Sequence, residues 1–134
     1  MNRKKIATGS KWEPVVGYSR AVRAGNLIFV AGTTAMGPDG VVGPGSPYMQ
    51  TKRILEIIDS ALQAAGGQLR DVVRTRIFVT DISQWEEVGR AHGEVFGNIR
   101  PVTSMVQVAK LISPELLVEI EADAVVATEE GHGP

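Results

Sequence analysis

Hydrophobic positions follow a helical period between residues 47 and 65, where one side of the segment is apolar and the other is polar. The apolar positions are Leu55, Ile58, Leu62 and Ala65. Ser46 and Pro47 have the pattern of an N-cap followed by proline in the first turn, and Gly66 supplies a stop. A capping-box pattern begins at Ser83 and predicts a second helix that extends to about Phe96.

Five shorter segments have the composition of β-strands, namely residues 19–23, 27–32, 71–80, 102–110 and 116–126. The first two flank Gly25 and predict a hairpin. The segment 27–32 is apolar without alternation, as is typical of a strand that is buried on both faces. The glycine- and proline-rich stretch between the hairpin and the first helix predicts a loop.

The segment 71–80 alternates, and this alternation predicts two different faces. Val73, Thr75, Ile77 and Val79 fall on one side. Arg74 and Arg76 fall on the other side.

The order of the predicted elements is ββαβαββ, which indicates one α+β domain over residues 1–134 with a mixed sheet. Its core spans about residues 17–126, and the polar ends at 1–14 and 128–134 are expected to lie outside it. Two helices can cover only one face of the sheet. Because the other face also contains apolar residues, a second copy of the chain is expected to cover it, which predicts a homo-oligomer.

Composition removes several classes of function. Lys and Arg number 14 against 15 Asp and Glu, for a net charge of -1, so we expect neither nucleic-acid nor membrane partners. The absence of cysteine excludes disulfides, thiolate metal sites and cysteine nucleophiles. The amino terminus lacks the apolar stretch of a signal peptide, which predicts a cytoplasmic protein. No P-loop or serine-nucleophile motif is found.

Acidic residues alternate with apolar ones along the last predicted strand, as Glu119, Glu121 and Asp123. An exposed, solvated face is the simpler interpretation of this pattern. The alternative places these acids, with Arg74 and Arg76, at a subunit boundary, where a desolvated carboxylate could activate water.

His92 lies on the apolar stripe of the second predicted helix, seven residues after Trp85 and four after Val88. A hydrogen-bonded core histidine is the favoured interpretation. The other histidine, His132, is in the tail, so the spacing of ligands predicts no metal site.

Several segments, taken in order, resemble the Rid family (reactive intermediate deaminases, YjgF-like). They are Gly17-Tyr18-Ser19, Gly25 to Gly32, Gln50-Thr51, Ala64-Ala65-Gly66, Asp71 to Thr75, Pro101 to Ala109 and Val118 to Ala122. The resemblance covers about residues 17–126. It implies a chorismate-mutase-like fold, a homotrimer with clefts between subunits, and hydrolysis of 2-imino acids and enamines to 2-oxo acids and ammonia. It implies no metal and no organic cofactor.

The resemblance also implies roles for single residues. Glu119 stands where the family's glutamate positions the attacking water, and Tyr18 stands where its tyrosine lines the cleft. Ala31, Gly32 and Thr33 replace the family's Ser-Gly-Gln. Thr103 and Met105 belong to the segment that binds substrate.

Thr103 stands where the family has an arginine that binds the substrate carboxylate. Gly89 replaces an asparagine, and His92 replaces an aromatic residue. Either the substrate lacks that carboxylate, or Arg20 or Arg76 replaces the lost clamp, although ordinary ion pairs are the favoured interpretation of both arginines. The leading hypothesis is a hydrolase of a small imine or enamine that differs from the usual 2-imino acids. The alternatives are a non-catalytic module that binds a small metabolite between subunits, and a structural role.

Overall fold

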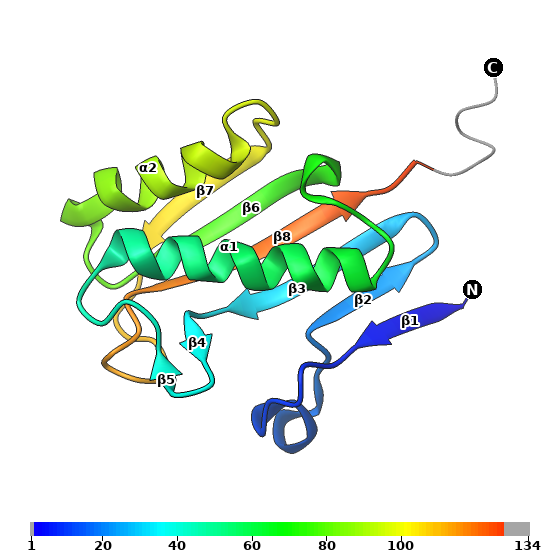
Figure 1. Cartoon of the computed structure of the whole chain (residues 1–134), viewed down its shortest axis with the longest axis horizontal. Coiled ribbons are helices and arrows are strands. Elements are labelled where there is room, and N and C mark those ends of the chain that lie inside the picture. Colours follow the sequence, from blue (N-terminus) through cyan, green and yellow to red (C-terminus); the bar gives the residue numbers. More distant parts are fainter. Residues whose placement is uncertain (1, 128–134) are drawn as a thin grey trace.

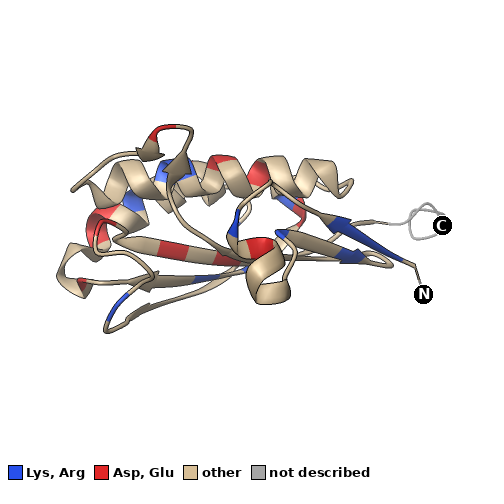
Figure 2. Cartoon of the chain, turned by 90° about the horizontal axis from the view of Figure 1, so that it is seen from below, with Lys and Arg blue, Asp and Glu red and all other residues tan. Residues whose placement is uncertain are grey.

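The computed structural model describes residues 2–127 and contains a six-stranded sheet with two helices on one face (Figures 1 and 2). The strands are β1 (Arg3–Ile6), β2 (Ala21–Ala24), β3 (Leu27–Thr33), β6 (Val72–Val79), β7 (Val102–Gln107) and β8 (Val118–Val125). Their order is β1-β2-β3-β8-β6-β7, and only β6 and β7 pair in parallel. The predicted tail at 128–134, with His132, lies outside the described residues.

Helix α1 (Pro47–Ala64) forms where the helical period predicts it. The hydroxyl of Ser46 accepts a hydrogen bond of 3.1 Å from the backbone N–H of Met49, which is the predicted N-cap. Gly66 follows the helix with a φ of 89°, in the left-handed region that favours glycine. The predicted start and end of this helix are therefore confirmed.

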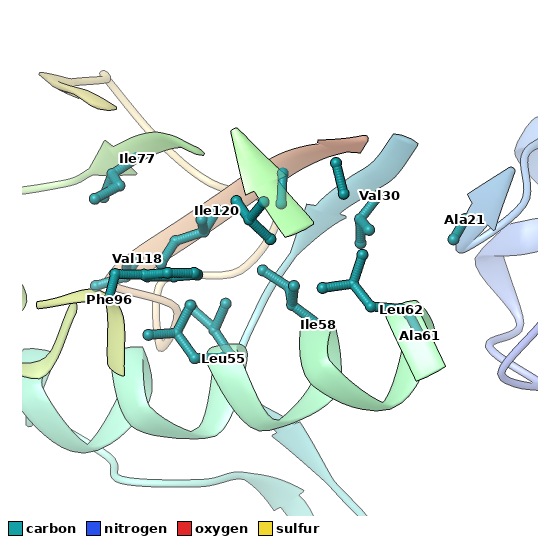
Figure 3. Close-up of a cluster of buried hydrophobic side chains, with 14 of the residues drawn as sticks. Ala21, Val30, Leu55, Ile58, Ala61, Leu62, Ile77, Phe96, Val118 and Ile120 are labelled. Atoms are coloured by element: carbon teal, nitrogen blue, oxygen red, sulfur yellow. The ribbon is translucent and has the colours of Figure 1, made fainter. Parts of the chain in front are cut away.

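The hydrophobic core lies between the helices and the sheet (Figure 3). The side chains of Leu55, Ile58 and Leu62 project from α1 toward the sheet. They are buried together with sheet residues and with Phe96 of α2 (Trp85–Phe96). No described helix is long and apolar enough to cross a membrane.

The amino-terminal region has more structure than the sequence predicted. Residues 3–6 form strand β1 at the sheet edge, although the sequence predicts no regular element in the polar end at 1–14. A single π-helical turn covers Glu13–Gly17. Within the predicted loop, β4 (Met36–Gly37) and β5 (Gly40–Val41) pair as a short hairpin. The ββαβαββ order is confirmed for the central elements, with β1 added before them.

The start of the second helix differs from the capping-box prediction. Asp81 accepts a hydrogen bond of 3.0 Å from the N–H of Ser83 and begins a 3-10 turn at Ile82–Gln84. Helix α2 follows at Trp85, and Ser83 does not cap it. Another 3-10 turn, Leu69–Asp71, precedes β6. Trp85 is exposed, so it does not share the buried stripe with Val88.

A bulge in β6 changes which residues face the core. The pairing of β6 with β8 shifts register between Val72 and Arg74. Val72 is therefore buried and Val73 is exposed, contrary to the alternation read from the sequence. Thr75, Ile77 and Val79 face the core as predicted.

The sheet face turned away from the helices, called the open face below, contains exposed apolar side chains. In β3 the burial alternates, so that Leu27 is 40% and Phe29 is 46% exposed while Ile28 and Val30 are buried. Within the described chain this strand is therefore buried on one face only. Its other face is the apolar face that a second copy of the chain is expected to cover.

Candidate functional site

Glu119 and Gly32 lie against each other on neighbouring strands. Glu119 belongs to β8, where alternation turns its side chain to the open face, and Gly32 lies near the end of β3 beside a break in register. A β-carbon at Gly32 would overlap the Oε2 atom of Glu119 and lie 3.0 Å from its Cδ atom. Only glycine therefore leaves room for the carboxylate in this position.

Burial raises the pKa of the Glu119 carboxyl, and the neighbouring Glu121 raises it further, while Arg20 lowers it. No group among residues 2–127 donates a hydrogen bond to this carboxylate. A half-buried carboxylate with unused acceptor positions and a raised pKa can hold a water molecule and take a proton from it.

Arg20 is buried beside Gly32 and is only 8% exposed. Its Nη1 atom donates to the carbonyl oxygen of Gly32 at 2.7 Å and to the hydroxyl of Thr33 at 3.0 Å. Its Nη2 atom donates to the hydroxyl of Tyr18 at 3.3 Å. The expectation that Arg20 forms a surface ion pair is wrong, because the described chain gives it neutral acceptors.

Five of the predicted site residues thus form one group around Glu119. The hydroxyl of Thr33 donates to the carbonyl oxygen of Ala31 at 2.8 Å, which links Ala31 to the same group. We call this set the Glu119 cluster. Its members are Tyr18, Arg20, Ala31, Gly32, Thr33 and Glu119.

Thr103 lies elsewhere, on edge strand β7. It is paired with Thr75 of β6, and the two hydroxyl oxygens are 2.7 Å apart. The Thr75 hydroxyl also lies 2.9 Å from Nε2 of His92. Met105 packs against the core from the same strand, on the helix side of the sheet. His92 is therefore hydrogen-bonded, as the favoured interpretation expects, but it is only partly buried.

The single chain does not bring Thr103 to the Glu119 cluster. Strands β8 and β6 separate the cluster from β7. In addition, Thr103 meets Thr75 on the helix side of the sheet, whereas Glu119 is on the open face.

Arg76 forms the cross-strand ion pairs that the sequence favoured. Its Nη1 atom is 3.4 Å from Glu121 and 3.3 Å from Asp123. It borders a shallow hollow of about 290 Å³ on the open face over β6 and β7. Since its charge is balanced by two carboxylates, Arg76 is a poor replacement for the lost carboxylate clamp.

Sequence reasoning missed Thr75, because the alternation placed it among the apolar core residues of its strand. The available signal was chemical, since threonine is the only residue with a hydroxyl on that side of the segment.

Among residues 2–127, no group of three or more acidic or histidine side chains is arranged to hold a metal ion.

Comparisons with known proteins agree with this fold. The family described as Endoribonuclease L-PSP matches residues 8–126. A crystal structure from Mycobacterium tuberculosis, described as a member of the YjgF/YER057c/UK114 family, is 57% identical with a TM-score of 0.85 and covers 93% of this chain and 100% of its own. A Rid-family structure from Yersinia pestis is 31% identical with a TM-score of 0.82, and covers 93% and 100%.

A sequence relative from Streptomyces coelicolor is 39% identical over 121 residues, which is 90% of each chain. The match to the family extends over the whole sheet except β1, over both helices and over every residue of the Glu119 cluster. The fold class predicted from the sequence is likewise confirmed by these structures. The chain therefore belongs to the YjgF/UK114 family of Endoribonuclease L-PSP proteins, the group that includes the Rid proteins.

Proposed function

We propose that this protein is a cytoplasmic hydrolase of a small reactive imine or enamine. In the reaction, Glu119 takes a proton from a water molecule as the water oxygen bonds to the imine carbon, and the second electron pair of the C=N bond moves to nitrogen, which takes up the proton from Glu119. Glu119 then takes the hydroxyl proton of this carbinolamine and passes it to the nitrogen as the C–N bond breaks, which releases ammonia and leaves a carbonyl product. An enamine enters the same reaction after it tautomerises to the imine. The residues of this chain supply the acid–base chemistry, and the proposal requires no cofactor.

One observation carries this proposal. The Glu119 carboxylate is half-buried against Gly32, has a raised pKa and accepts no hydrogen bond from the described residues. A purely structural carboxylate in such a place would ordinarily be paired, since burial of a charge without a partner is costly. The test is ammonia release from a panel of imines and enamines generated in situ. Absence of turnover across the panel, with ligand binding retained, would favour a metabolite-binding module.

That second function has its own support. The buried Arg20 already donates to three protein oxygens, and Arg76 is ion-paired, so neither arginine is held ready for a substrate carboxylate. A module that binds a neutral metabolite would need no such cation. Binding without turnover, measured calorimetrically with the carbonyl product of each candidate substrate, would identify it.

A small molecule fits the charge distribution better than RNA, although the family description names an endoribonuclease. The chain has a net charge of -1, and basic and acidic positions are interspersed over its elements (Figure 2). A surface that binds phosphates needs a concentration of positive charge.

We propose that the working form is a homotrimer in which a neighbouring copy brings Thr103 close to the Glu119 cluster. Two features support this assembly. The open face exposes Leu27 and Phe29 to solvent, and the two parts of the predicted site lie apart within one chain. The proposal therefore accounts for both features with one interface.

The substitution Phe29→Glu should dissociate the trimer, because it places a charge at an apolar contact. Light scattering coupled to size exclusion should show a monomer for this variant. Met49→Glu is the matched control, since Met49 is equally exposed but lies on α1, away from the open face. A wild-type monomer at micromolar concentration would refute the trimer.

Wild-type protein should hydrolyse 2-iminopropanoate and 2-iminobutanoate poorly, because Thr103 offers a neutral hydroxyl where an arginine would bind the carboxylate. Thr103→Arg should raise kcat/KM for these substrates about tenfold, from one charge-assisted contact of ~1.5 kcal/mol in the transition state. A larger gain is not expected, because no neighbouring residue has been selected to orient the new side chain. Efficient wild-type hydrolysis of either substrate would contradict the missing-clamp argument.

A further inference from the structure

A continuous chain of hydrogen-bonding groups runs from α2 along the helix side of the sheet to its edge. Nε2 of His92 lies 2.9 Å from the hydroxyl of Thr75, which lies 2.7 Å from the hydroxyl of Thr103. Thr75 is 0% exposed, so its hydroxyl is shielded from solvent and has these two partners among the described residues. Thr103 is exposed at the other end. Two departures from the family pattern, at positions 92 and 103, are thus joined physically.

The direction of the hydrogens along this chain is set at one end, because each hydroxyl has a single hydrogen. If Nε2 of His92 is bare, Thr75 donates to it and Thr103 donates to Thr75. The oxygen lone pairs of Thr103 then face outward. If Nε2 carries a hydrogen, both bonds reverse, and the Thr103 hydrogen can turn outward or toward the carbonyl oxygen of Pro101, which lies 3.3 Å from the Thr103 hydroxyl. A bare Nε2 therefore leaves Thr103 only lone pairs to offer a ligand, whereas a protonated Nε2 allows Thr103 to offer its hydrogen.

We propose that His92 is a positioning residue which, through Thr75, makes Thr103 a hydrogen-bond acceptor toward the substrate. The inference rests on the proposed function, in which Thr103 borders the substrate cleft. It identifies the substrate as an imine or enamine that presents an N–H group, such as an amine or amide, where the usual substrates present a carboxylate. An outward lone pair attracts an N–H group and repels a carboxylate.

The surroundings of His92 are consistent with a neutral ring. Burial lowers its pKa, and its ring packs against that of Phe96 with centroids 4.7 Å apart. The charged side chains on adjoining segments have other partners. Lys52 of α1 pairs with Glu94 of α2 at 3.2 Å, and Arg100 donates to the carbonyl oxygen of Gly97 at 3.1 Å. A ring without a charged neighbour can keep Nε2 bare and available to Thr75.

The first test uses the free protein and needs no substrate. The ¹⁵N chemical shift of Nε2 in His92 at neutral pH should be that of an unprotonated nitrogen that accepts a hydrogen bond. In Thr75→Val this shift should move toward that of a bare nitrogen without a donor, whereas Thr75→Ser should retain it. A protonated Nε2 in the wild-type protein would overturn the inference.

The second test is kinetic and uses whichever substrate the ammonia-release panel identifies. Thr75→Val should raise KM roughly 2- to 12-fold, as expected for the loss of one oriented hydrogen bond, with little change in kcat. Thr75→Ser should restore KM. Thr51→Val is the matched control, since Thr51 is also fully buried but donates to Pro47 within α1. Equal effects of both valine variants would overturn the inference.

The two tests separate the inference from the proposed function. If no imine or enamine is hydrolysed, the proposed function fails. The ¹⁵N chemical shift of His92 still determines the direction of the hydrogen bonds that join His92, Thr75 and Thr103. If hydrolysis occurs and Nε2 is protonated, the function stands and the inference fails.

Discussion

Glu119→Gln should reduce the hydrolysis rate by a factor of ~10² to 10⁴ and leave the assembly intact. Glutamine has the shape of glutamate and fits beside Gly32, but its amide cannot take a proton from water, and loss of a positioned base has an effect of this size. Ammonia release from the best substrate measures the rate, and light scattering checks the assembly. Glu121→Gln is the control, because Glu121 pairs with Arg76 and the resemblance assigns it no catalytic role. An unchanged rate in Glu119→Gln would remove this residue from the mechanism.

The pH profile provides a second measurement on the same variant. A general base acts only when it is deprotonated, and the pKa of Glu119 is raised above the ordinary value for glutamate. The decrease of kcat/KM at acid pH should therefore begin at a higher pH than an ordinary glutamate would give. This acid-side decrease should be absent from the pH profile of Glu119→Gln.

Glu119→Gln should not lower the free energy of unfolding at neutral pH. When folding raises the pKa of a carboxyl, the folded protein loses stability as pH rises from the unfolded-state pKa to the folded-state pKa. The charged form of Glu119 is therefore the form that the folded state disfavours. A thermal unfolding experiment on both proteins checks this sign.

Gly32→Ala should reduce activity by about 10²-fold, the effect of displacing a reactive group by about an ångström. The new methyl group would occupy the place of the Glu119 carboxylate, and the flexible glutamate side chain would move away. The backbone at Gly32 is not in the left-handed region, so the fold should tolerate alanine. A crystal structure of the variant and its ammonia release test both claims.

Gly93→Ala is the matched control for this substitution. An added β-carbon at Gly93 would meet no atom within 4 Å beyond its chain neighbours and the backbone of its own helix, α2. Its activity should equal that of the wild-type protein. If Gly32→Ala also remained fully active, the position of the Glu119 carboxylate would not matter for the reaction.

The sequence predicts the central elements well, because their signals are local. The apolar stripe of α1, its serine cap and the glycine after it agree with one another, and the structure contains all three. Strand β1 escaped prediction for a physical reason. Three of its four residues are basic, and Ile6 alone is apolar, so this edge strand, which is held by backbone pairing with β2, has no alternating apolar pattern to detect.

Register and side-chain direction were less predictable. The bulge in β6 reverses the orientation of Val73, and an alternating pattern has no signal for one extra residue. The same limit applies to Arg20, whose burial depends on acceptors supplied by Gly32 and Thr33, which are 12 and 13 residues away. For the Glu119 cluster, the identities of its members were predicted, but the contacts that join them come only from the fold.

The parallel pairing of β6 with β7 has a consequence for local opening. The contact between Thr75 and Thr103 spans 28 residues and depends on an edge strand that is held by one neighbour only. Edge segments with exposed side chains open locally at lower free energy than a protein's core. Whenever β7 detaches, Thr103 separates from Thr75 while the hydroxyl of Thr75 remains bonded to His92. Hydrogen exchange at the β7 amides would therefore report how often the site loses Thr103, independently of global unfolding.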